Sequence, residues 1–444
     1  QLGIPTTIVE AGELGGVCLN VGCIPSKALI TASKSYAKTQ KMATMGITVS
    51  GASVDMGKMQ TWKGGIVKRL TTGVGQLLKA NGVKIVKGRA SIEKAGWVSV
   101  TADDGSQSKL ECSAIIVATG SRPIQVPGFE FDNQNILDST GALALDELPK
   151  HMVVIGGGYI GLELGGTYSR MGTKVTVVEM MDQLLPGFDK DLVQPVERAL
   201  KKDKTKIMLK TKALGWKKSG DELLCEVEDS KGRKQEIPCD KILVTVGRRP
   251  NSENLGLDSA GVQTDSRGFI QINTRLETNV PGIYAIGDVA GGLMLAHKAS
   301  KEGEVVAEVV AGKATEIDVK CIPAIVFTDP EVASVGLTAK EARAAGHEVT
   351  IGKYPFAALG RSMTTNQTDG FARVVVAKDT KEILGAQIVG AGASDLISEA
   401  GLAIEMGAFA DDISLTVHAH PTLPEALMEA AAAAIGESIH LINK

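Results

Sequence analysis

Two short sequence patterns occur twice in this chain, each time in the same order. PTTIVE at 5–10 resembles KVTVVE at 174–179, and AIIVATGSRP at 114–123 resembles KILVTVGRRP at 241–250. Such an internal echo is typical of duplicated structural units. Each pattern is a strand-like apolar run, and helix-like stretches such as SKALITASKSYAK at 26–38 alternate with these runs. The alternation predicts α/β domains with parallel sheets, two of them nucleotide-binding domains built on the same plan.

A glycine-rich loop, GGGYIG at 156–161, follows the strand-like run at 152–155 and opens a helix-like stretch. In nucleotide-binding units such glycines let the backbone approach a pyrophosphate at the helix N-terminus. Glu179 ends the next strand-like run, where an acid accepts a ribose hydroxyl, and no arginine follows it to favour a 2′-phosphate. The pattern predicts NAD rather than NADP. The alternative is a turn that only packs helix on strand.

The echo also shows what the first copy lacks. Gly156 precedes Glu179 by 23 residues (179 minus 156), and the same step back from Glu10 would fall before Gln1. We therefore expect the first strand, the glycine loop and most of the first helix of the first domain to be missing. Glu10 itself corresponds to Glu179. A flavin dinucleotide is expected beside Glu10, because a flavin exchanges two electrons with a dithiol and with a nicotinamide.

Two cysteines, Cys18 and Cys23, lie in GGVCLNVGCIPSK at 15–27. A zinc site would need about four ligands, and no second Cys or His pair at ligand spacing accompanies them; a buried core pair is another alternative. Cys23 precedes Pro25, a good first helical residue, so a helix N-terminus would stabilise its thiolate. If the helix starts near Cys23, Lys27 lies on the same face. This setting favours a redox pair.

A loop near the C-terminus, HAHPTLPEA at 418–426, carries two histidines. Thr422 and Glu425 predict a capping box for a helix with Pro424 in its first turn, which would explain Glu425 without any function. Thiol exchange, however, needs a general base, and histidine has the suitable pKa. From spacing alone, the structural and the catalytic interpretations stay equally open.

The composition excludes several classes of protein. Hydrophobic residues make up 43% and charged residues 22%, as in a globular protein. The net charge of −3 comes without a basic stripe, so nucleic acid is not expected as a partner. The most apolar run, 152–166, is interrupted by Glu163, so no membrane span is expected. Six cysteines in 444 residues are too few for a disulfide scaffold, which favours a reducing compartment.

From about residue 320 the sequence changes, with strand-like and alanine-rich helical stretches but no glycine loop. These segments predict a separate α+β domain whose helices pack against a partner. Taken together, GGVCLNVGCIPSK, GGGYIGLE, ATGSRP, VGRRPN, YAIGDV and HAHPTLPE resemble the dihydrolipoyl dehydrogenases of the pyridine nucleotide-disulfide oxidoreductases. The resemblance implies an α/β fold with two Rossmann-like domains, for FAD and NAD, and a C-terminal α+β domain that forms a homodimer. The implied limits are 1–146 for the FAD domain, 147–272 for the NAD domain, 273–319 for a return to the FAD domain and 320–444 for the interface domain.

The resemblance also implies roles for single residues. Cys18 would be the thiol that exchanges with the lipoyl group, and Cys23 the thiol against the flavin. Lys27 would lie near the flavin ring and pair with Glu163. The acid–base group and the residue that orients it would be His420 and Glu425.

Two further sets of residues would contact the nucleotides. Tyr159 departs from the lipoamide enzymes, where an aliphatic residue is usual, and is similar to glutathione reductases. The FAD set is Glu10, Gly16, Lys27, Ala90, Thr119, Gly120, Asp288 and Ala296; the NAD set is Gly156, Gly157, Gly158, Tyr159, Ile160, Gly161, Glu163, Glu179, Ala213 and Gly247.

The implied activity is FAD-dependent oxidation of dihydrolipoamide, with NAD as acceptor, on lipoyl domains of the acyltransferase of 2-oxo acid dehydrogenase complexes. A glutathione-type reductase would prefer NADP, and mercuric or large thioredoxin reductases would need cysteines beyond Cys321, the last one here. A catalytically dead dimeric scaffold is a further alternative if the missing glycine loop abolishes FAD binding. A bacterial cytoplasm is expected, with the mitochondrial matrix as alternative.

Overall fold

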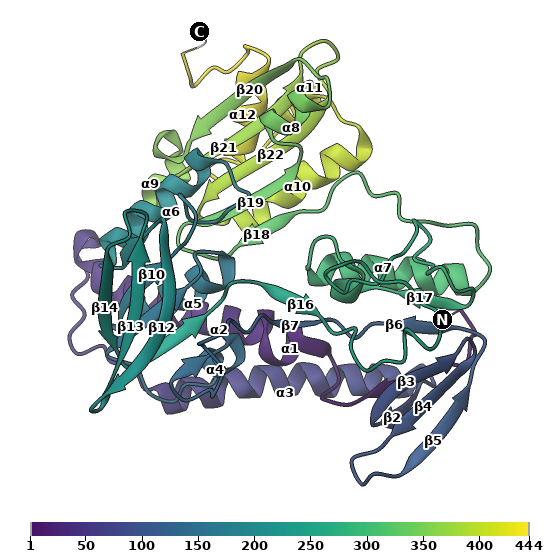
Figure 1. Cartoon of the computed structure of the whole chain (residues 1–444). Coiled ribbons are helices and arrows are strands. Elements are labelled where there is room, and N and C mark those ends of the chain that lie inside the picture. The colour runs from purple at the N-terminus through teal and green to yellow at the C-terminus, as the bar shows by residue number, and fades with distance from the viewer. Residues whose placement is uncertain (1, 443–444) are drawn as a thin grey trace.

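The repeated patterns at 114–123 and 241–250 each end in a short strand, and these two strands pair with each other. The computed structural model describes residues 2–442, so the predicted domain limits at residues 1 and 444 lie outside it. β7 (Ser121–Pro123) pairs antiparallel with β16 (Arg248–Pro250) where the chain leaves its first domain and returns to it. Figure 1 shows these two strands side by side at the centre of the molecule.

The second domain is built on a five-stranded parallel sheet in the order β11-β10-β9-β15-β8. Its central strands are buried along almost their whole length, as expected for a parallel sheet covered on both faces. The edge strand β8 lies on the N-terminal side of the boundary expected at 146/147. The elements are β8 (Ile136–Leu137), α4 (Ser139–Leu143), β9 (His151–Ile155), α5 (Tyr159–Arg170), β10 (Lys174–Val178), α6 (Lys190–Lys202), β11 (Lys206–Met208), β12 (Thr211–Ser219), β13 (Glu222–Asp229), β14 (Lys234–Cys239) and β15 (Lys241–Val244).

The first domain consists of two parallel strand pairs, β1–β2 and β6–β17, and an antiparallel three-stranded sheet. Its core includes Leu257 and Ile270 packed with Ile92 and Ile115, so the segment after β16 belongs with this domain rather than with the second. The elements are β1 (Thr7–Glu10), α1 (Gly16–Val21), α2 (Cys23–Lys41), η1 (Met42–Met45), α3 (Met56–Ala80), β2 (Lys84–Lys87), β3 (Arg89–Lys94), β4 (Trp97–Thr101), β5 (Gln107–Glu111), β6 (Ile115–Val117), β17 (Ile283–Ala285), η2 (Gly287–Ala290) and α7 (Ala296–Val310).

The third domain is the α+β unit expected after residue 320. Its antiparallel sheet has the order β18-β19-β22-β21-β20, and the helices α10 and α12 pack on it. At Gly352 the sheet and α12 approach so closely that a Cβ would lie 1.8 Å from the carbonyl oxygen of Ala430. The elements are β18 (Ala324–Val326), β19 (Glu331–Gly336), α8 (Ala339–Ala344), β20 (Val349–Pro355), η3 (Phe356–Ala358), α9 (Gly360–Thr364), β21 (Phe371–Ala377), β22 (Ile383–Gly390), α10 (Ala393–Met406), α11 (Ala410–Leu415) and α12 (Glu425–Ala434).

The helix α2 connects the three domains. Its buried Leu29 belongs to the same apolar cluster as Leu162 of α5 and Val389 of the third domain. The N-terminal part of α2, which begins at the predicted redox pair, is therefore held by packing from all three domains. Between residues 2 and 442, no helix is long and apolar enough to cross a membrane.

Candidate active site

The two cysteines of the N-terminal loop form a disulfide across the start of α2. Cys18 in α1 is bonded to Cys23, with their Cα atoms 4.6 Å apart. α2 begins at Cys23, two residues before Pro25, so the condition that the helix starts near Cys23 is met. The turn between the two helices requires a glycine, because a Cβ on Gly22 would lie 2.9 Å from the carbonyl oxygen of Val17. The free N–H groups of the first turn of α2 stabilise negative charge on Cys23 when the disulfide opens.

The four other cysteines have the opposite environment. Burial raises the pKa of Cys225 to about 12 and that of Cys239 to about 12. Burial and the nearby Glu405 raise the pKa of Cys321 to about 11, and burial also raises the pKa of Cys112. These thiols stay protonated at neutral pH and are poor nucleophiles. Reactive sulfur chemistry therefore belongs to the Cys18–Cys23 pair.

A lysine and a glutamate lie beside the redox helix. The Lys27 ammonium is 2.8 Å from an oxygen of Glu163 on α5, as the family resemblance implied. Glu163 is buried, and its second oxygen accepts a hydrogen bond of 2.9 Å from the backbone N–H of Phe327. The ammonium also lies 4.3 Å from the centre of the Phe327 ring. One residue from each of three domains therefore meets at the first turns of α2.

The histidine loop holds a second chemical group. His420 Nδ1 lies 2.8 Å from Glu425, which also accepts the backbone N–H of Thr422 at 2.8 Å. The His420 side chain is 78% exposed, whereas Glu425 is only 16% exposed. An exposed imidazole fixed by an enclosed carboxylate is suited to exchange protons with a substrate.

The predicted capping box at this loop is wrong in part. Glu425 does accept the N–H of Thr422, but the Thr422 hydroxyl donates to the carbonyl of Ala419 instead of accepting from the helix. α12 begins at Glu425, and Pro424 precedes it. A box starting at Thr422 would need Leu423 in helical conformation, which a following proline disfavours. The carboxylate of Glu425 is thus shared between the loop backbone and His420.

The neighbouring His418 has a different environment. Its Nδ1 lies 2.8 Å from the carbonyl of Thr416, and its Nε2 lies 2.9 Å from Glu399 on α10. The side chain is 6% exposed. Both ring nitrogens are occupied, so this histidine stabilises the loop.

Within one chain, the histidine loop and the cysteines lie in different domains. Figure 1 shows α12 in the uppermost domain and α1 well below it, between β7 and α3. The structure therefore does not bring His420 to Cys18 in the same subunit, although both groups are exposed at least in part.

The glycine loop of the second domain has the geometry of a dinucleotide site. Gly156 has φ of 104°, and a Cβ there would lie 2.6 Å from the carbonyl oxygen of Thr245. Gly158 caps α5 without any side-chain hydrogen bond, which leaves N–H groups of the first turn for a phosphate. Glu179 is buried, and its two oxygens accept the N–H groups of Gly157 at 2.6 Å and of Met181 at 2.7 Å. Each oxygen keeps a lone pair for a ribose hydroxyl.

A second group of predicted residues lies at strand ends in the first domain. The parallel strands β6 and β17 end side by side, and Thr119, Gly120 and Asp288 follow them. Ligands of α/β sheets bind at such carboxyl ends. Glu10 ends β1, and its carboxylate accepts the N–H of Gly12 at 2.7 Å. The hydroxyl and carboxylate acceptors fit the polar part of a flavin dinucleotide.

The remaining predicted residues are placed as follows. Tyr159 opens α5. Burial raises the pKa of its hydroxyl, Arg248 opposes this shift, and the charges of Glu163 and Asp288 add to it. Tyr159 thus lies between the two nucleotide regions. Gly16 opens α1, Ala90 lies in β3, Ala296 opens α7, Ile160 and Gly161 lie in the first turn of α5, Ala213 lies at a bulge in β12 and Gly247 precedes β16.

Several residues near these groups were not predicted. Ser121 donates to Asp288 and accepts from Arg248 Nε at 2.7 Å, which fixes the Asp288 carboxylate. Both are in the repeated patterns, so the echo itself could have indicated them. Phe327 and Glu399 have no local sequence signal, because their partners are far away along the chain.

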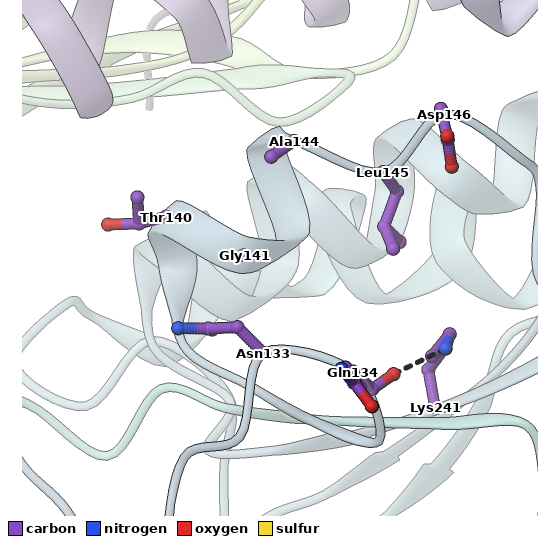
Figure 2. Close-up of a pocket in the computed structure, with 8 residues that line it drawn as sticks. All are labelled: Asn133, Gln134, Thr140, Gly141, Ala144, Leu145, Asp146 and Lys241. Carbon is purple, nitrogen blue, oxygen red and sulfur yellow. Dashed lines mark hydrogen bonds between the residues drawn. The ribbon is translucent and has the colours of Figure 1, made fainter.

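One surface pocket lies away from these groups. Figure 2 shows this pocket of about 460 Å³ between α4 and the loop before β8, where Lys241 donates to the carbonyl of Gln134. None of the predicted site residues lines it. The pocket is lined by Asn133, Gln134, Thr140, Gly141, Ala144, Leu145, Asp146 and Lys241.

Among the described residues, no cluster of His, Cys, Asp and Glu could hold a metal ion.

Comparisons with known proteins agree with this geometry. Residues 1–303 match the family described as pyridine nucleotide-disulphide oxidoreductase, and residues 322–431 match the dimerisation domain of that family. Dihydrolipoyl dehydrogenase of Geobacillus stearothermophilus is 50% identical over 444 residues, covering 100% of this chain and 94% of the relative. That of Bacillus subtilis (strain 168) is 48% identical, with 100% and 94% covered.

Solved structures give the same result for the fold. The chain is similar to LpdA from Mycobacterium tuberculosis, with a TM-score of 0.90, 26% identity, and 96% of this chain and 93% of that one covered. It is also similar to the HOCl-induced flavoprotein disulfide reductase RclA from Escherichia coli, with a TM-score of 0.86, 25% identity, and 97% and 94% covered.

Proposed function

This chain belongs to the pyridine nucleotide-disulphide oxidoreductase family, and from this premise we propose that it oxidises dihydrolipoamide to lipoamide, with FAD as cofactor and NAD as electron acceptor. The observation that carries the proposal is the Cys18–Cys23 disulfide at the start of α2, beside the Lys27–Glu163 pair. The relatives named dihydrolipoyl dehydrogenase, 48–50% identical over the whole chain, support this substrate.

The residues at the strand ends of the first domain fit FAD, which when bound accepts two electrons from a dithiol and passes them on to NAD. Glu10 would accept hydroxyl donors of its ribose, and Asp288 would accept donors of its polar chain. Ser121 and Arg248 fix the Asp288 carboxylate, so this acceptor is held in place before any ligand arrives.

The thiol exchange uses groups of the protein itself. His420 takes a proton from dihydrolipoamide, and the resulting thiolate attacks Cys18 Sγ. The Cys18–Cys23 bond breaks, and Cys23 leaves as a thiolate stabilised by the N-terminus of α2 and by Lys27. The second substrate thiol then displaces Cys18 and closes the lipoamide disulfide. The departing Cys18 sulfur takes the first proton from His420, and His420 takes the proton of the second substrate thiol. The substrate has lost two electrons and two protons, and the cysteine pair has gained the electrons.

Glu179 supports NAD over NADP. Its carboxylate is buried and accepts two backbone N–H groups, which fix it beside the ribose site. A 2′-phosphate would be repelled there, whereas a hydroxyl would donate a hydrogen bond. We expect Glu179→Ala to relax the preference for NADH over NADPH, measured as the ratio of kcat/KM values.

We also propose that His420 acts on the thiols of the partner subunit in a homodimer. The dimerisation-domain match supports the homodimer. Leu402, Met406, Leu415 and Val417, near the histidine loop, are 62–95% exposed in the single chain, so this surface is suited to cover by a second copy. Symmetry would then create two equivalent sites, each with cysteines from one chain and His420 from the other.

A subunit-exchange experiment tests this arrangement. Chains with Cys23→Ser and chains with His420→Gln are each expected to be inactive. Mixed dimers of the two should regain up to about half the wild-type activity per dimer, since one site then has both intact groups. Verified heterodimers without activity would show that His420 works in its own chain or is not the base.

The overall activity is tested with the purified protein. We expect a yellow flavoprotein that reduces NAD with dihydrolipoamide and that loses this reaction in Cys18→Ser. A colourless protein, or faster turnover of oxidised glutathione with NADPH, would contradict the proposal. Lipoyl domains of a 2-oxo acid dehydrogenase acyltransferase are the proposed macromolecular partner, to be tested as substrates in place of free dihydrolipoamide. The bacterial relatives support a cytoplasmic site of action.

A further inference from the structure

We propose that Phe327 of the third domain is a positioning residue for the thiol chemistry, because it fixes the Lys27 ammonium beside the first turn of α2. The inference rests on the proposed role of the Cys18–Cys23 pair. It adds a residue that acts through Lys27.

Phe327 contacts both members of the Lys27–Glu163 pair, each through a different group. Its backbone N–H donates to Glu163 Oε1 at 2.9 Å, while Lys27 binds Glu163 Oε2 at 2.8 Å. Its ring centre lies 4.3 Å from the Lys27 Nζ. The carboxylate is therefore held from two sides, and the ammonium lies between a carboxylate and an aromatic face.

A lysine at this position needs such a second contact. The Lys27 side chain is 31% exposed, and a single ion pair at that exposure leaves a flexible four-carbon chain several rotamers. A cation over an aromatic ring is attracted by the ring electrons, which adds a contact with a defined direction. With both contacts the ammonium is confined near Cys23, which lies one helical turn earlier on the same face.

The backbone around Phe327 is itself fixed. Val326 is buried at the end of β18, and the buried Thr328 hydroxyl donates to the carbonyl of Pro330 at 2.7 Å. Glu331, at the start of β19, forms an ion pair of 3.2 Å with Lys34, two turns after Lys27 on α2. The segment 326–331 therefore contacts the redox helix at two points and can hold its first turns in one position.

The test separates the ring of Phe327 from its backbone. Phe327→Leu removes the aromatic face and keeps the N–H to Glu163, and Phe327→Tyr is the matched control that keeps the face. Both are made in the FAD-loaded protein with Cys18→Ser, where Cys23 is the only thiol of the pair. The rate of alkylation of Cys23 by iodoacetamide is followed against pH by peptide mass spectrometry. The other cysteines, with pKa values raised by burial, react at higher pH.

We expect Phe327→Leu to raise the pH midpoint of Cys23 alkylation by about 0.5 units, and Phe327→Tyr to leave it within about 0.2 units. With Cys18 intact, Phe327→Leu should lower kcat about three-fold. A lower melting temperature with an unchanged midpoint would show that Phe327 only packs, and would overturn the inference.

A double-mutant cycle with Lys27→Met separates this inference from the proposed function. Lys27→Met should raise the Cys23 midpoint further than Phe327→Leu, and adding Phe327→Leu to it should change nothing more, because the ring acts through the ammonium. No shift in Lys27→Met would refute the proposed role of Lys27. A shift in Lys27→Met but none in Phe327→Leu, or additive shifts, would refute the role of Phe327.

Discussion

His418 and His420 are two residues apart in the same loop, and each has a glutamate partner, yet their surroundings differ. His418 is 6% exposed, and both of its ring nitrogens have partners, Thr416 and Glu399. His420 is 78% exposed and uses only Nδ1, toward Glu425. In the described part of the chain, its Nε2 has no hydrogen-bond partner. Only His420 therefore has a nitrogen that can reach a substrate.

The difference shows what a partner does for a histidine. When the carboxylate is on a neighbouring helix, as for His418, the ring joins two elements and is enclosed. For His420 the carboxylate belongs to the first residue of the helix that follows the loop. It orients the ring through Nδ1 and leaves the Nε2 edge exposed. An oriented imidazole with one free nitrogen is the arrangement that general acid–base catalysis requires.

The largest expected effect comes from His420→Gln. Loss of the base should lower kcat for dihydrolipoamide and NAD about 10²- to 10⁴-fold. Reduction of a quinone dye by NADH needs no thiol exchange and should stay near the wild-type rate, which makes it the control. A His420→Gln enzyme that still oxidises dihydrolipoamide at the normal rate would remove the basis of the comparison.

A smaller effect is expected from Glu425→Gln, which removes the orienting charge. A hydrogen bond to a charged group contributes about 1.5–3 kcal/mol, so kcat should fall about 10- to 100-fold.

The pH dependence of stability gives a second measurement. Burial opposes the shift, but the Thr422 N–H and His420 together lower the pKa of Glu425.

Because this pKa is lowered in the folded state, the carboxylate stabilises the fold above its unfolded pKa of about 4.3. The contribution is lost as the pH falls through the folded pKa. The melting temperature of Glu425→Gln should therefore be below wild type at pH 7, and the two should converge below about pH 4. A constant difference at all pH values would assign the effect to packing instead.

The sequence predicted those parts of the site that depend on local patterns. The disulfide, the start of α2 at Cys23, and the strand–loop–helix at Gly156 follow from residue types close together in the chain. The Lys27–Glu163 pair came from the family resemblance, since no local pattern joins α2 to α5.

The remaining features depend on contacts between distant segments. The choice between the two histidines is decided by Glu399, which comes from α10 and has no spacing rule that links it to the loop. Phe327 reaches Lys27 only after the third domain has packed on α2. The two-residue strand β8 is too short for a periodic signal, so its place at the edge of the second domain's sheet could not be predicted.

The next effect is expected on stability rather than on rate. His418→Gln removes a buried ring with two partners, so the free energy of unfolding should fall by about 1–3 kcal/mol, measured by urea denaturation. Turnover of dihydrolipoamide should stay within about three-fold of wild type, because neither ring nitrogen can reach a substrate. If His418→Gln loses as much kcat as His420→Gln, the two histidines act together and exposure does not separate their roles.

The smallest effect is expected at a third histidine–glutamate pair, which extends the comparison to the end of the chain. His440 Nδ1 lies 2.5 Å from Glu429, one turn after Glu425 on α12, and its side chain is 68% exposed. The hydrogen bond to Glu429 and the charge of Glu429 raise the pKa of His440, with a minor contribution from Glu425 and weak opposition from burial. Because the folded-state pKa is raised, protonated His440 stabilises the fold below the unfolded pKa of about 6.5. This contribution is lost as the pH rises through the folded pKa. Solvent screens so exposed a pair, so His440→Gln should lower the melting temperature by only about 1 °C at pH 5.5, and not at pH 9 or in high salt.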